Sequence, residues 1–251
     1  MLNILLCGCG GRMGAAVAAA AAAAGDRIVA GVDINPAESS PYPVFTSPEE
    51  FPGKADVIID FSHHSALGAL IAYAKRAETP LVVCTTGHTE SELALMKQAA
   101  LEIPLFFSRN MSLGINLLIS LCRRAALTLG DDFDIEIIEK HHNKKLDAPS
   151  GTALMIADAI TEGQREAHPY VFDRHAERRE RARGEIGLHA VRGGTIVGEH
   201  EVLFAGKDEI ITLSHSAASR EVFATGALRA AHFMAGKSKG FYNMDDVVSA
   251  L

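Results

Sequence analysis

The stretch LNILLCGCGGRMGAAVAAAAAAA, residues 2–24, decides the fold. Its first part, Leu2–Cys7, is a short apolar run, which is typical of a buried β-strand. Its last part, Ala15–Ala24, consists almost entirely of alanine, which has the highest helix propensity, and it is too short and too weakly apolar to span a bilayer. The glycines between these segments predict a sharp turn that joins a strand to a helix.

The glycine turn indicates a nucleotide site. Gly8, Gly11 and Gly14 have the spacing G-x-x-G-x-x-G, and Gly10 adds a G-x-G. The pattern is close to the dinucleotide fingerprint G-x-G-x-x-G, from which it departs because position 13 is Met. Glycines at such a turn let backbone N–H groups approach a pyrophosphate at the helix N-terminus. The alternative is a tight turn that binds no ligand.

An acidic residue, Asp33, follows the second predicted strand, Arg27–Val32. A carboxylate at this position accepts hydrogen bonds from both ribose hydroxyls of NADH and repels the 2′-phosphate of NADPH. Ile34 and Asn35 carry no charge that would offset this repulsion, whereas Arg12 could swing toward a 2′-phosphate. We therefore expect NADH as the preferred cofactor, with NADPH as the alternative.

Strand-like and helix-like segments alternate after this point, which predicts an α/β fold with a Rossmann-type, doubly wound parallel sheet. The strands are expected at Val57–Phe61, Leu81–Cys84 and Leu105–Phe107, and the helices at Ser65–Arg76 and Glu90–Ala100.

The pattern changes after Ser112 and predicts a second α+β domain. Its helices are expected at Ile115–Leu129 and Thr152–Ile160, and its strands at Phe133–Ile138, Glu185–Val191, Thr195–Phe204 and Glu209–His215, the last three antiparallel. A final helix, Phe223–Ala235, is expected to return to the first domain. The predicted division is a dinucleotide-binding domain at 1–112 and 221–251, and a substrate-binding and oligomerisation domain at 113–220.

The second informative stretch is EKHHNKKLDAPSGTA, residues 139–153. It combines two imidazoles, three lysines and a helix start. Imidazole exchanges protons near neutral pH, while lysines and helix N-termini attract anions. The combination indicates a site for a carboxylate or phosphate substrate that must also be protonated. A solvated loop is the alternative.

Composition excludes other classes. A net charge of -7 argues against a nucleic-acid partner, and the basic segment Arg174–Arg183 is interleaved with Glu177 and Glu180, which favours a solvated loop. The four cysteines lack metal spacing and fit reduced thiols in the cytoplasm. Three histidines on strand-like stretches are expected to be structural, so no metal is predicted; they are His189, His200 and His215. Neither a signal peptide nor a membrane segment is expected.

The glycine turn and the 139–153 run together resemble the dihydrodipicolinate reductase family, also called 4-hydroxy-tetrahydrodipicolinate reductase. The resemblance extends over essentially the whole chain and includes Asp60–Ser62, Thr85–Gly87, Asn110–Gly114, Gly198–His200 and Ser219–Arg220. It implies an NAD(P)H-dependent oxidoreductase of diaminopimelate and lysine biosynthesis, with a dicarboxylate substrate and usually a homotetrameric assembly. It also implies that closure of the two domains brings cofactor and substrate together.

The resemblance implies a role for individual residues. His141 corresponds to the proton donor or acceptor and Lys145 to the second catalytic group, and which of them delivers the proton stays open. His142, Gly151 and Thr152 correspond to substrate-binding residues. The family usually has a basic residue after the acidic ribose-binding position, and this chain has none there. The residues expected around the cofactor are Gly8, Gly11, Arg12, Met13, Gly14, Asp33, Phe61, Thr85, Thr86, Gly87, Ser108, Asn110 and Met111.

Two other functions compete with this interpretation. An amino-acid or semialdehyde dehydrogenase shares the two-domain design, but a semialdehyde dehydrogenase needs a cysteine nucleophile in an exposed loop. A nucleotide-sensing regulator would keep the glycine turn and would have no need of His141 together with Lys145.

Overall fold

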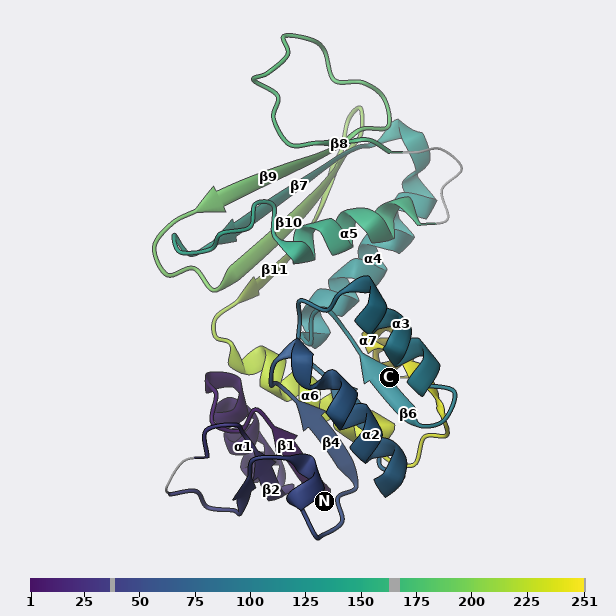
Figure 1. Cartoon of the computed structure of the whole chain (residues 1–251). Coiled ribbons are helices and arrows are strands. Elements are labelled where there is room, and N and C mark those ends of the chain that lie inside the picture. The colour runs from purple at the N-terminus through teal and green to yellow at the C-terminus, as the bar shows by residue number, and fades with distance from the viewer. Residues whose placement is uncertain (37–38, 163–167, 251) are drawn as a thin grey trace. The chain divides into compact units, whose positions relative to one another are not determined.

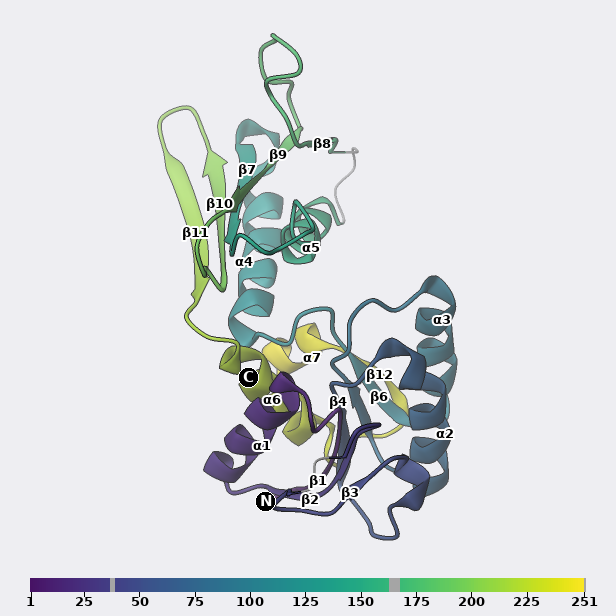
Figure 2. The same ribbon diagram turned by 60° about the vertical axis from the view of Figure 1, so that its left-hand side comes forward.

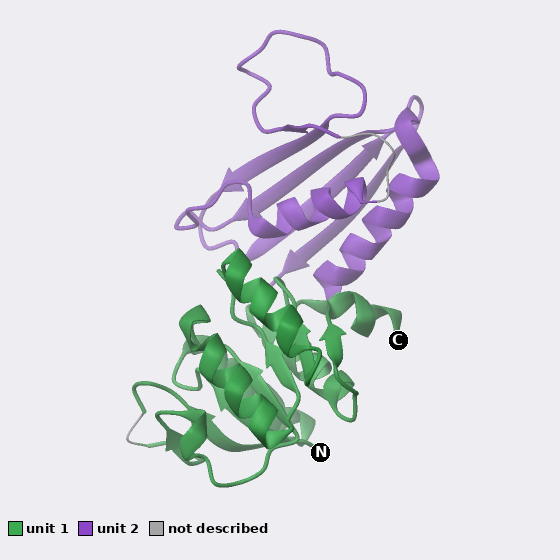
Figure 3. Ribbon diagram, turned by 45° about the vertical axis from the view of Figure 1, so that its right-hand side comes forward, with its two compact units in different colours: residues 1–113, 220–251 green, residues 114–219 purple. Residues whose placement is uncertain are grey.

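The computed structural model describes residues 1–36, 39–162 and 168–250 (Figure 1). The chain divides into two compact units, coloured separately in Figure 3. Unit 1 comprises Met1–Leu113 and Arg220–Leu251, and unit 2 comprises Gly114–Ser219. The first unit is therefore built from both ends of the chain, and the second is one continuous segment.

Unit 1 contains a seven-stranded sheet in the order β12-β6-β5-β4-β1-β2-β3, and all of its described strand pairs are parallel. The chain leaves the central strand β1 in one direction through β2 and later continues from β4 in the other. This reversal of direction is the topological switch point at which such sheets bind ligands. The prediction of a doubly wound parallel sheet is confirmed. The strands are β1 Asn3–Cys7, β2 Arg27–Val32, β3 Val44–Phe45, β4 Val57–Asp60, β5 Leu81–Val83, β6 Pro104–Phe107 and β12 Gly240–Tyr242.

Helices cover both faces of this sheet (Figure 2). Successive residues of a strand point to opposite faces, so a strand buried on both sides is apolar throughout. In β1, Ile4 and Leu6 pack with one group of helices, while Leu5 and Cys7 pack with the other. The first group is α1 Arg12–Ala24, α6 Glu221–Met234 and α7 Met244–Ser249, and the second is α2 Leu67–Ala77 and α3 Glu90–Ala99.

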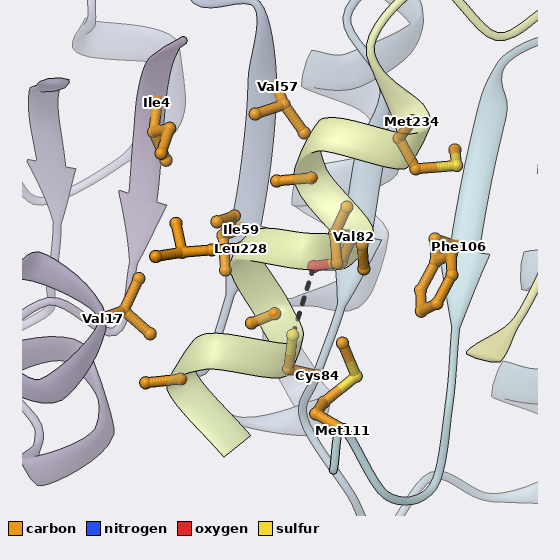
Figure 4. Packing of buried hydrophobic residues seen from close by; sticks show 14 of the residues in the cluster. Ile4, Val17, Val57, Ile59, Val82, Cys84, Phe106, Met111, Leu228 and Met234 are labelled. Atoms are coloured by element: carbon orange, nitrogen blue, oxygen red, sulfur yellow. Dashed lines mark hydrogen bonds between the residues drawn. The ribbon is translucent and has the colours of Figure 1, made fainter. Parts of the chain in front are cut away.

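The helix α6 approaches the chain near Met111 very closely, in the core shown in Figure 4. A Cβ atom on Gly226 would overlap the carbonyl oxygen of Met111. The helix carries mostly alanine toward the core, which lets it lie close to α1 and to the sheet. Glycine at 226 is therefore a packing requirement of unit 1.

Unit 2 contains a five-stranded sheet in the order β11-β10-β7-β9-β8. The helices α4 and α5 pack on one of its faces and share a core with it. The bounds are α4 Leu113–Leu129, β7 Asp134–His141, α5 Gly151–Thr161, β8 Tyr170–Val171, β9 Ile186–Arg192, β10 Gly198–Ala205 and β11 Ile210–Ala217.

The predicted antiparallel arrangement of the last three strands is wrong for β9. This strand is parallel to β7 and lies on the side of β7 away from β10, whereas β10 and β11 are antiparallel neighbours. The cause is α5, which carries the chain back along the sheet so that the next strands run in the direction of β7. The strands β9 and β10 are consecutive in the sequence, but β7 lies between them in the sheet.

The basic segment 174–183 is an exposed loop, as predicted, and three of its arginines also bind carboxylates of unit 2. Arg174 and Arg181 both bind Glu136, which projects from β7. Arg174 and Arg179 bind Glu185, whose side chain is 1% exposed. Buried carboxylates need cationic partners, and this loop supplies them.

By length and composition, one helical segment in the described part of the chain, Leu113–Asp132, could cross a membrane. It includes α4, whose buried apolar residues belong to the core of unit 2. A helix in the core of a folded domain can have the same length and apolar composition as a membrane-spanning helix.

Replacing Gly226 by alanine is expected to lower the free energy of unfolding by roughly 2–3 kcal/mol, because the new methyl group collides with backbone. Gly68, in α2, is the matched control, since a Cβ there meets nothing within 4 Å. Gly68→Ala is expected to be neutral or to stabilise by up to about 1 kcal/mol. Chemical unfolding measures both. If the two variants changed the free energy of unfolding by the same amount, the packing argument would be contradicted.

Candidate active site

The glycine turn is shaped by close backbone contacts in unit 1. Gly8 has φ of 75° and donates its N–H to the Val32 carbonyl at 2.8 Å. A Cβ on Gly8 would collide with the Phe61 backbone, and one on Gly14 would overlap the Gly8 carbonyl. These two glycines let the first strand turn sharply and bring α1 close against it.

The N-terminus of α1 opens at this turn. Gly11 is its N-cap residue, no described side chain caps it, and its first turn contains no acidic residue. A cavity of about 460 Å³ lies beside the turn, and its lining includes Gly8, Gly11, Asp33 and Phe61. The uncapped helix terminus favours an anion, so the cavity fits the pyrophosphate and adenosine half of a dinucleotide.

Asp33 is oriented by backbone groups. One carboxylate oxygen accepts the Gly10 N–H at 2.9 Å, and the other accepts the Asn35 N–H at 3.0 Å. Each oxygen retains acceptor capacity for a ribose hydroxyl. Ile34 is 84% exposed and uncharged. Arg12 is exposed on the first turn of α1, whereas Met13 is half-buried against the core.

The segment Thr85–Gly87 follows β5 and is held by Asp60 at the end of β4. One Asp60 oxygen accepts the Thr85 hydroxyl at 2.8 Å, and the other accepts the Ser62 N–H at 2.9 Å. Burial raises the pKa of Asp60, and the hydrogen bonds from Ser62 and Thr85 oppose that rise. Thr86 and Gly87 are exposed. Asp60 thus orders two loops at the switch point.

The segment from Ser108 to Met111 forms a local turn after β6. The Ser108 hydroxyl donates to the Asn110 carbonyl at 2.8 Å, and the Asn110 side-chain oxygen accepts the Ser112 N–H at 2.9 Å. The Met111 side chain is 3% exposed and belongs to the hydrophobic core. Its carbonyl oxygen is packed against Gly226 of α6.

In unit 2, β7 runs to His141, so this histidine is a strand residue; the strand was predicted to end at Ile138. Its Nδ1 lies 2.6 Å from Oε2 of Glu139, the residue two positions earlier on the same strand face. Glu139 is fully buried. Arg192 on β9 donates to both of its oxygens, at 2.6 and 2.7 Å, and Ser150 donates its N–H at 2.9 Å.

These contacts set the charges of the site. Burial alone would raise the pKa of Glu139, but hydrogen bonds from Arg192, His141 and Ser150 outweigh burial and hold that pKa below its usual value. Burial lowers the pKa of His141, Glu139 opposes this effect, and Lys145 and Arg192 add to it. The result is an ionised carboxylate beside an imidazole that releases its proton readily.

Lys145 lies in the loop after β7 and contacts Asp147 at 2.8 Å. Its backbone N–H donates to the His142 carbonyl, and Nδ1 of His142 is buried with no partner among the described atoms. Lys144 is exposed. The structure thus distinguishes Lys145, whose side chain is 21% exposed, from its neighbour in the sequence.

The N-terminus of α5 completes the arrangement. Ser150 is the N-cap, and its hydroxyl accepts the Ala153 N–H at 3.1 Å. Gly151 and Thr152 begin the helix, where backbone N–H groups bind anions. His200 on β10 contacts the same hydroxyl at 3.1 Å and packs edge-on against His141. Burial, followed by His141, lowers the pKa of His200 to about 4.

Four residues of this arrangement were not among the predicted site residues, and one of them, His200, was expected to be structural. They are Glu139, Arg192, Ser150 and His200. Arg192 is the register partner of His141 across β7 and β9, more than fifty residues along the chain. These two residues lie side by side only because β7 and β9 pair in parallel, and that pairing was not predicted. His189, which was also expected to be structural, lies outside this arrangement, and its Nε2 is 2.6 Å from Oε2 of Glu136.

Among residues 1–36, 39–162 and 168–250, no three His, Cys, Asp or Glu side chains converge in a way that could hold a metal ion.

His200 is expected to make the protein less stable at acidic pH. Its folded-state pKa of about 4 lies below the ordinary value of 6.5, so the unfolded chain binds the proton more readily and stability falls as the pH falls through this window. The difference between these two pKa values corresponds to about 3 kcal/mol of folding free energy, which is lost as the pH falls from 6.5 to about 4. His200→Gln should remove this part of the loss, as measured by chemical unfolding at each pH. The exposed His175→Gln is the control, and an unchanged pH dependence in His200→Gln would contradict the assignment.

Comparison with known proteins identifies the family. The family model described as "Dihydrodipicolinate reductase, N-terminus" matches residues 2–111, and the one described as "Dihydrodipicolinate reductase, C-terminus" matches residues 114–248. The 4-hydroxy-tetrahydrodipicolinate reductase of Caldanaerobacter subterraneus subsp. tengcongensis is 52% identical over 249 residues, which cover 99% of this chain and 98% of that protein. The protein of the same name from Clostridium tetani is 47% identical over 251 residues, which cover 100% of this chain and 98% of that protein.

A solved structure shows the same architecture. The dipicolinate-bound dihydrodipicolinate reductase from Paenisporosarcina sp. TG-14 superimposes with a TM-score of 0.81 at 25% identity, and the match covers 98% of this chain and 99% of that one. The chain therefore belongs to the dihydrodipicolinate reductase family.

Proposed function

We propose that the protein reduces 4-hydroxy-tetrahydrodipicolinate to tetrahydrodipicolinate with a nicotinamide cofactor, as a step of diaminopimelate and lysine biosynthesis. Family membership supports the reaction. The observation that carries the mechanism is a buried imidazole, His141, whose Nδ1 is tied to Glu139 beside Lys145 and a helix N-terminus. A pyridine dicarboxylate occupies the related Paenisporosarcina protein, which supports a dicarboxylate substrate.

Unit 1 fits a dinucleotide. The bound nicotinamide would supply the hydride. Gly8, Gly11 and Gly14 let backbone N–H groups and the α1 terminus hold the pyrophosphate, and Asp33 accepts hydrogen bonds from the adenosine ribose. The other residues proposed to contact the cofactor are Arg12, Met13, Phe61, Thr85, Thr86, Gly87, Ser108, Asn110 and Met111.

Unit 2 binds the substrate and handles the proton. The N–H groups of Gly151 and Thr152 and the Lys145 ammonium hold the carboxylates, and His142 contributes a further polar contact. Loss of the 4-hydroxyl group as water leaves a conjugated ring. Negative charge develops on the nitrogen of that ring when a hydride adds to it, so a positioned acid must protonate the nitrogen. Both His141 and Lys145 are candidates for the proton transfer. His141 carries an imidazole, which exchanges protons near neutral pH, and Lys145 carries an ammonium group.

We further propose that the protein is a cytoplasmic homotetramer assembled through unit 2. Family resemblance is the main support for the tetramer. Unit 2 also exposes large apolar side chains, including Ile210 at 63% and Phe172 at 54%. Such exposure is typical of surfaces that associate with another chain.

The rival functions fit less well. All four cysteines are buried, and burial raises the pKa of Cys7 and Cys84 well above the ordinary thiol value. A thiol in this state is a poor nucleophile, which disfavours a semialdehyde dehydrogenase. A nucleotide sensor would have no use for the buried Glu139–His141 pair.

His141→Ala and Lys145→Ala are each expected to lower kcat by about 10²-fold or more, because each removes a group that transfers a proton or holds a carboxylate. NADH affinity should stay near normal in both variants. The readout is loss of nicotinamide absorbance with freshly made substrate, together with fluorescence titration of NADH. Lys144→Ala is the matched control and should retain wild-type turnover. Unchanged turnover in both site variants would refute the assignment, and NADH binding without any wild-type turnover would favour the sensor.

The wild type is expected to use NADH with a kcat/KM at least about tenfold higher than with NADPH, since Asp33 repels a 2′-phosphate. Ile34→Arg should raise the efficiency with NADPH, because a guanidinium at this exposed position pairs with phosphate. Ile34→Gln, which adds length without charge, should not. A wild-type preference for NADPH would overturn the prediction.

A further inference from the structure

We propose that Glu139 and Arg192 form a positioning pair that fixes the tautomer of His141 and sets its proton affinity through opposing charges. This inference rests on the proposed function, in which His141 exchanges a proton with the substrate. Neither residue needs to touch the substrate for this role. They act through the imidazole, one from its own strand and the other from the neighbouring strand β9.

The tautomer follows from the chemistry of the acceptor. An ionised carboxylate has no hydrogen to donate, so the Nδ1 of His141 that faces Glu139 at 2.6 Å must carry the hydrogen. The neutral imidazole therefore has its lone pair on Nε2. Protons therefore enter and leave the imidazole at Nε2.

Arg192 keeps this carboxylate ionised and fixed in place. It donates to both Glu139 oxygens, while Ser150 donates a third hydrogen bond to Oε1. The bidentate geometry prevents rotation of the carboxylate. Arg192 also donates to the Asp147 carbonyl at 2.7 Å. One ion pair thus joins the catalytic strand, the loop after it and the N-terminus of α5.

The ring is also confined on the Nε2 side. A Cβ built on Gly198 would lie 3.1 Å from Nε2, so the bare backbone of β10 leaves the space that the imidazole occupies. His200 contacts the ring edge-on, with 5.3 Å between the ring centroids. The imidazole therefore has a defined plane, a defined tautomer and a defined reactive nitrogen.

Four charged or titratable groups face His141 from the surrounding elements: Glu139 on β7, Lys145 in the next loop, Arg192 on β9 and His200 on β10. Glu139 favours the imidazolium, whereas the two cations disfavour it. His200 is buried and neutral at pH 7. Removal of Glu139 and removal of Arg192 must therefore move the titration of His141 in opposite directions.

The test is an NMR titration of the His141 ring in Glu139→Gln, Arg192→Gln and Arg192→Lys, without substrate. Glu139→Gln should lower the midpoint of the titration by about one pH unit or more, and Arg192→Gln should raise it. Arg192→Lys retains the charge and should remain near the wild type. Ring ¹⁵N shifts should report hydrogen on Nδ1 in the wild type and a mixture of tautomers in Glu139→Gln.

Activity measurements on the same variants complete the test. Glu139→Gln should lower kcat by about 10²-fold with the KM for NADH unchanged. The pH profile of kcat/KM should shift with the titration in each variant. Glu199→Gln is the matched control, because this carboxylate pairs with Lys140 across β7 and β10 on the opposite face of the sheet. It should leave both readouts unchanged.

The outcomes separate this inference from the proposed function. The positioning pair would be overturned if Glu139→Gln and Arg192→Gln shifted the midpoint of the His141 titration in the same direction or left it unchanged. This holds even if the wild type reduces the substrate. If Glu139→Gln does not fold, the sign of the Arg192→Gln shift decides the inference. Absence of wild-type turnover would refute the proposed function, while the titration would still report on the pair.

Discussion

A fully buried carboxylate must be neutralised by its surroundings, and in unit 2 this constraint is imposed by Glu139. Its partners come from three places: the same strand, the neighbouring strand β9 and the start of α5. Strand pairing, helix capping and the orientation of His141 therefore depend on one another. The site needs no separate scaffold, since the interactions that compensate the buried charge also define its geometry.

Unit 1 meets a different constraint, namely close approach of backbone to backbone. Gly8 and Gly14 let the first strand, the turn and α1 come together at distances that a side chain would forbid, and Gly226 does the same for α6. The turn leaves a helix terminus open to an anion, and Asp33 stands beside it, held by backbone N–H groups. Tight packing at the core and an accessible binding edge are consequences of the same glycines.

The elements of unit 1 were predictable because apolar runs and glycine turns are local signals: Arg27–Val32 was predicted with its observed ends. The two-residue strand Val44–Phe45 was missed, since so short a segment carries no periodicity. In unit 2 the 139–153 run pointed to an anion site, but its partner Arg192 was invisible because the pairing of β7 with β9 is not local. The pairing of the 174–183 arginines with carboxylates was hidden for the same reason: Glu136 lies on β7 and Glu185 immediately precedes β9, and the sequence does not reveal how these strands are arranged.

The return of α6 to the first unit has a consequence for how the chain is made. Residues 220–251 supply two of the three helices on one face of the unit 1 sheet, including the core residues Ala227, Leu228 and Met234. A ribosome delivers these helices last, after the whole of unit 2, so the nascent N-terminal sheet waits with one face incompletely covered. The continuous middle segment can close its own core earlier. The order of synthesis and the order of folding therefore differ, and the segment synthesised first is completed last.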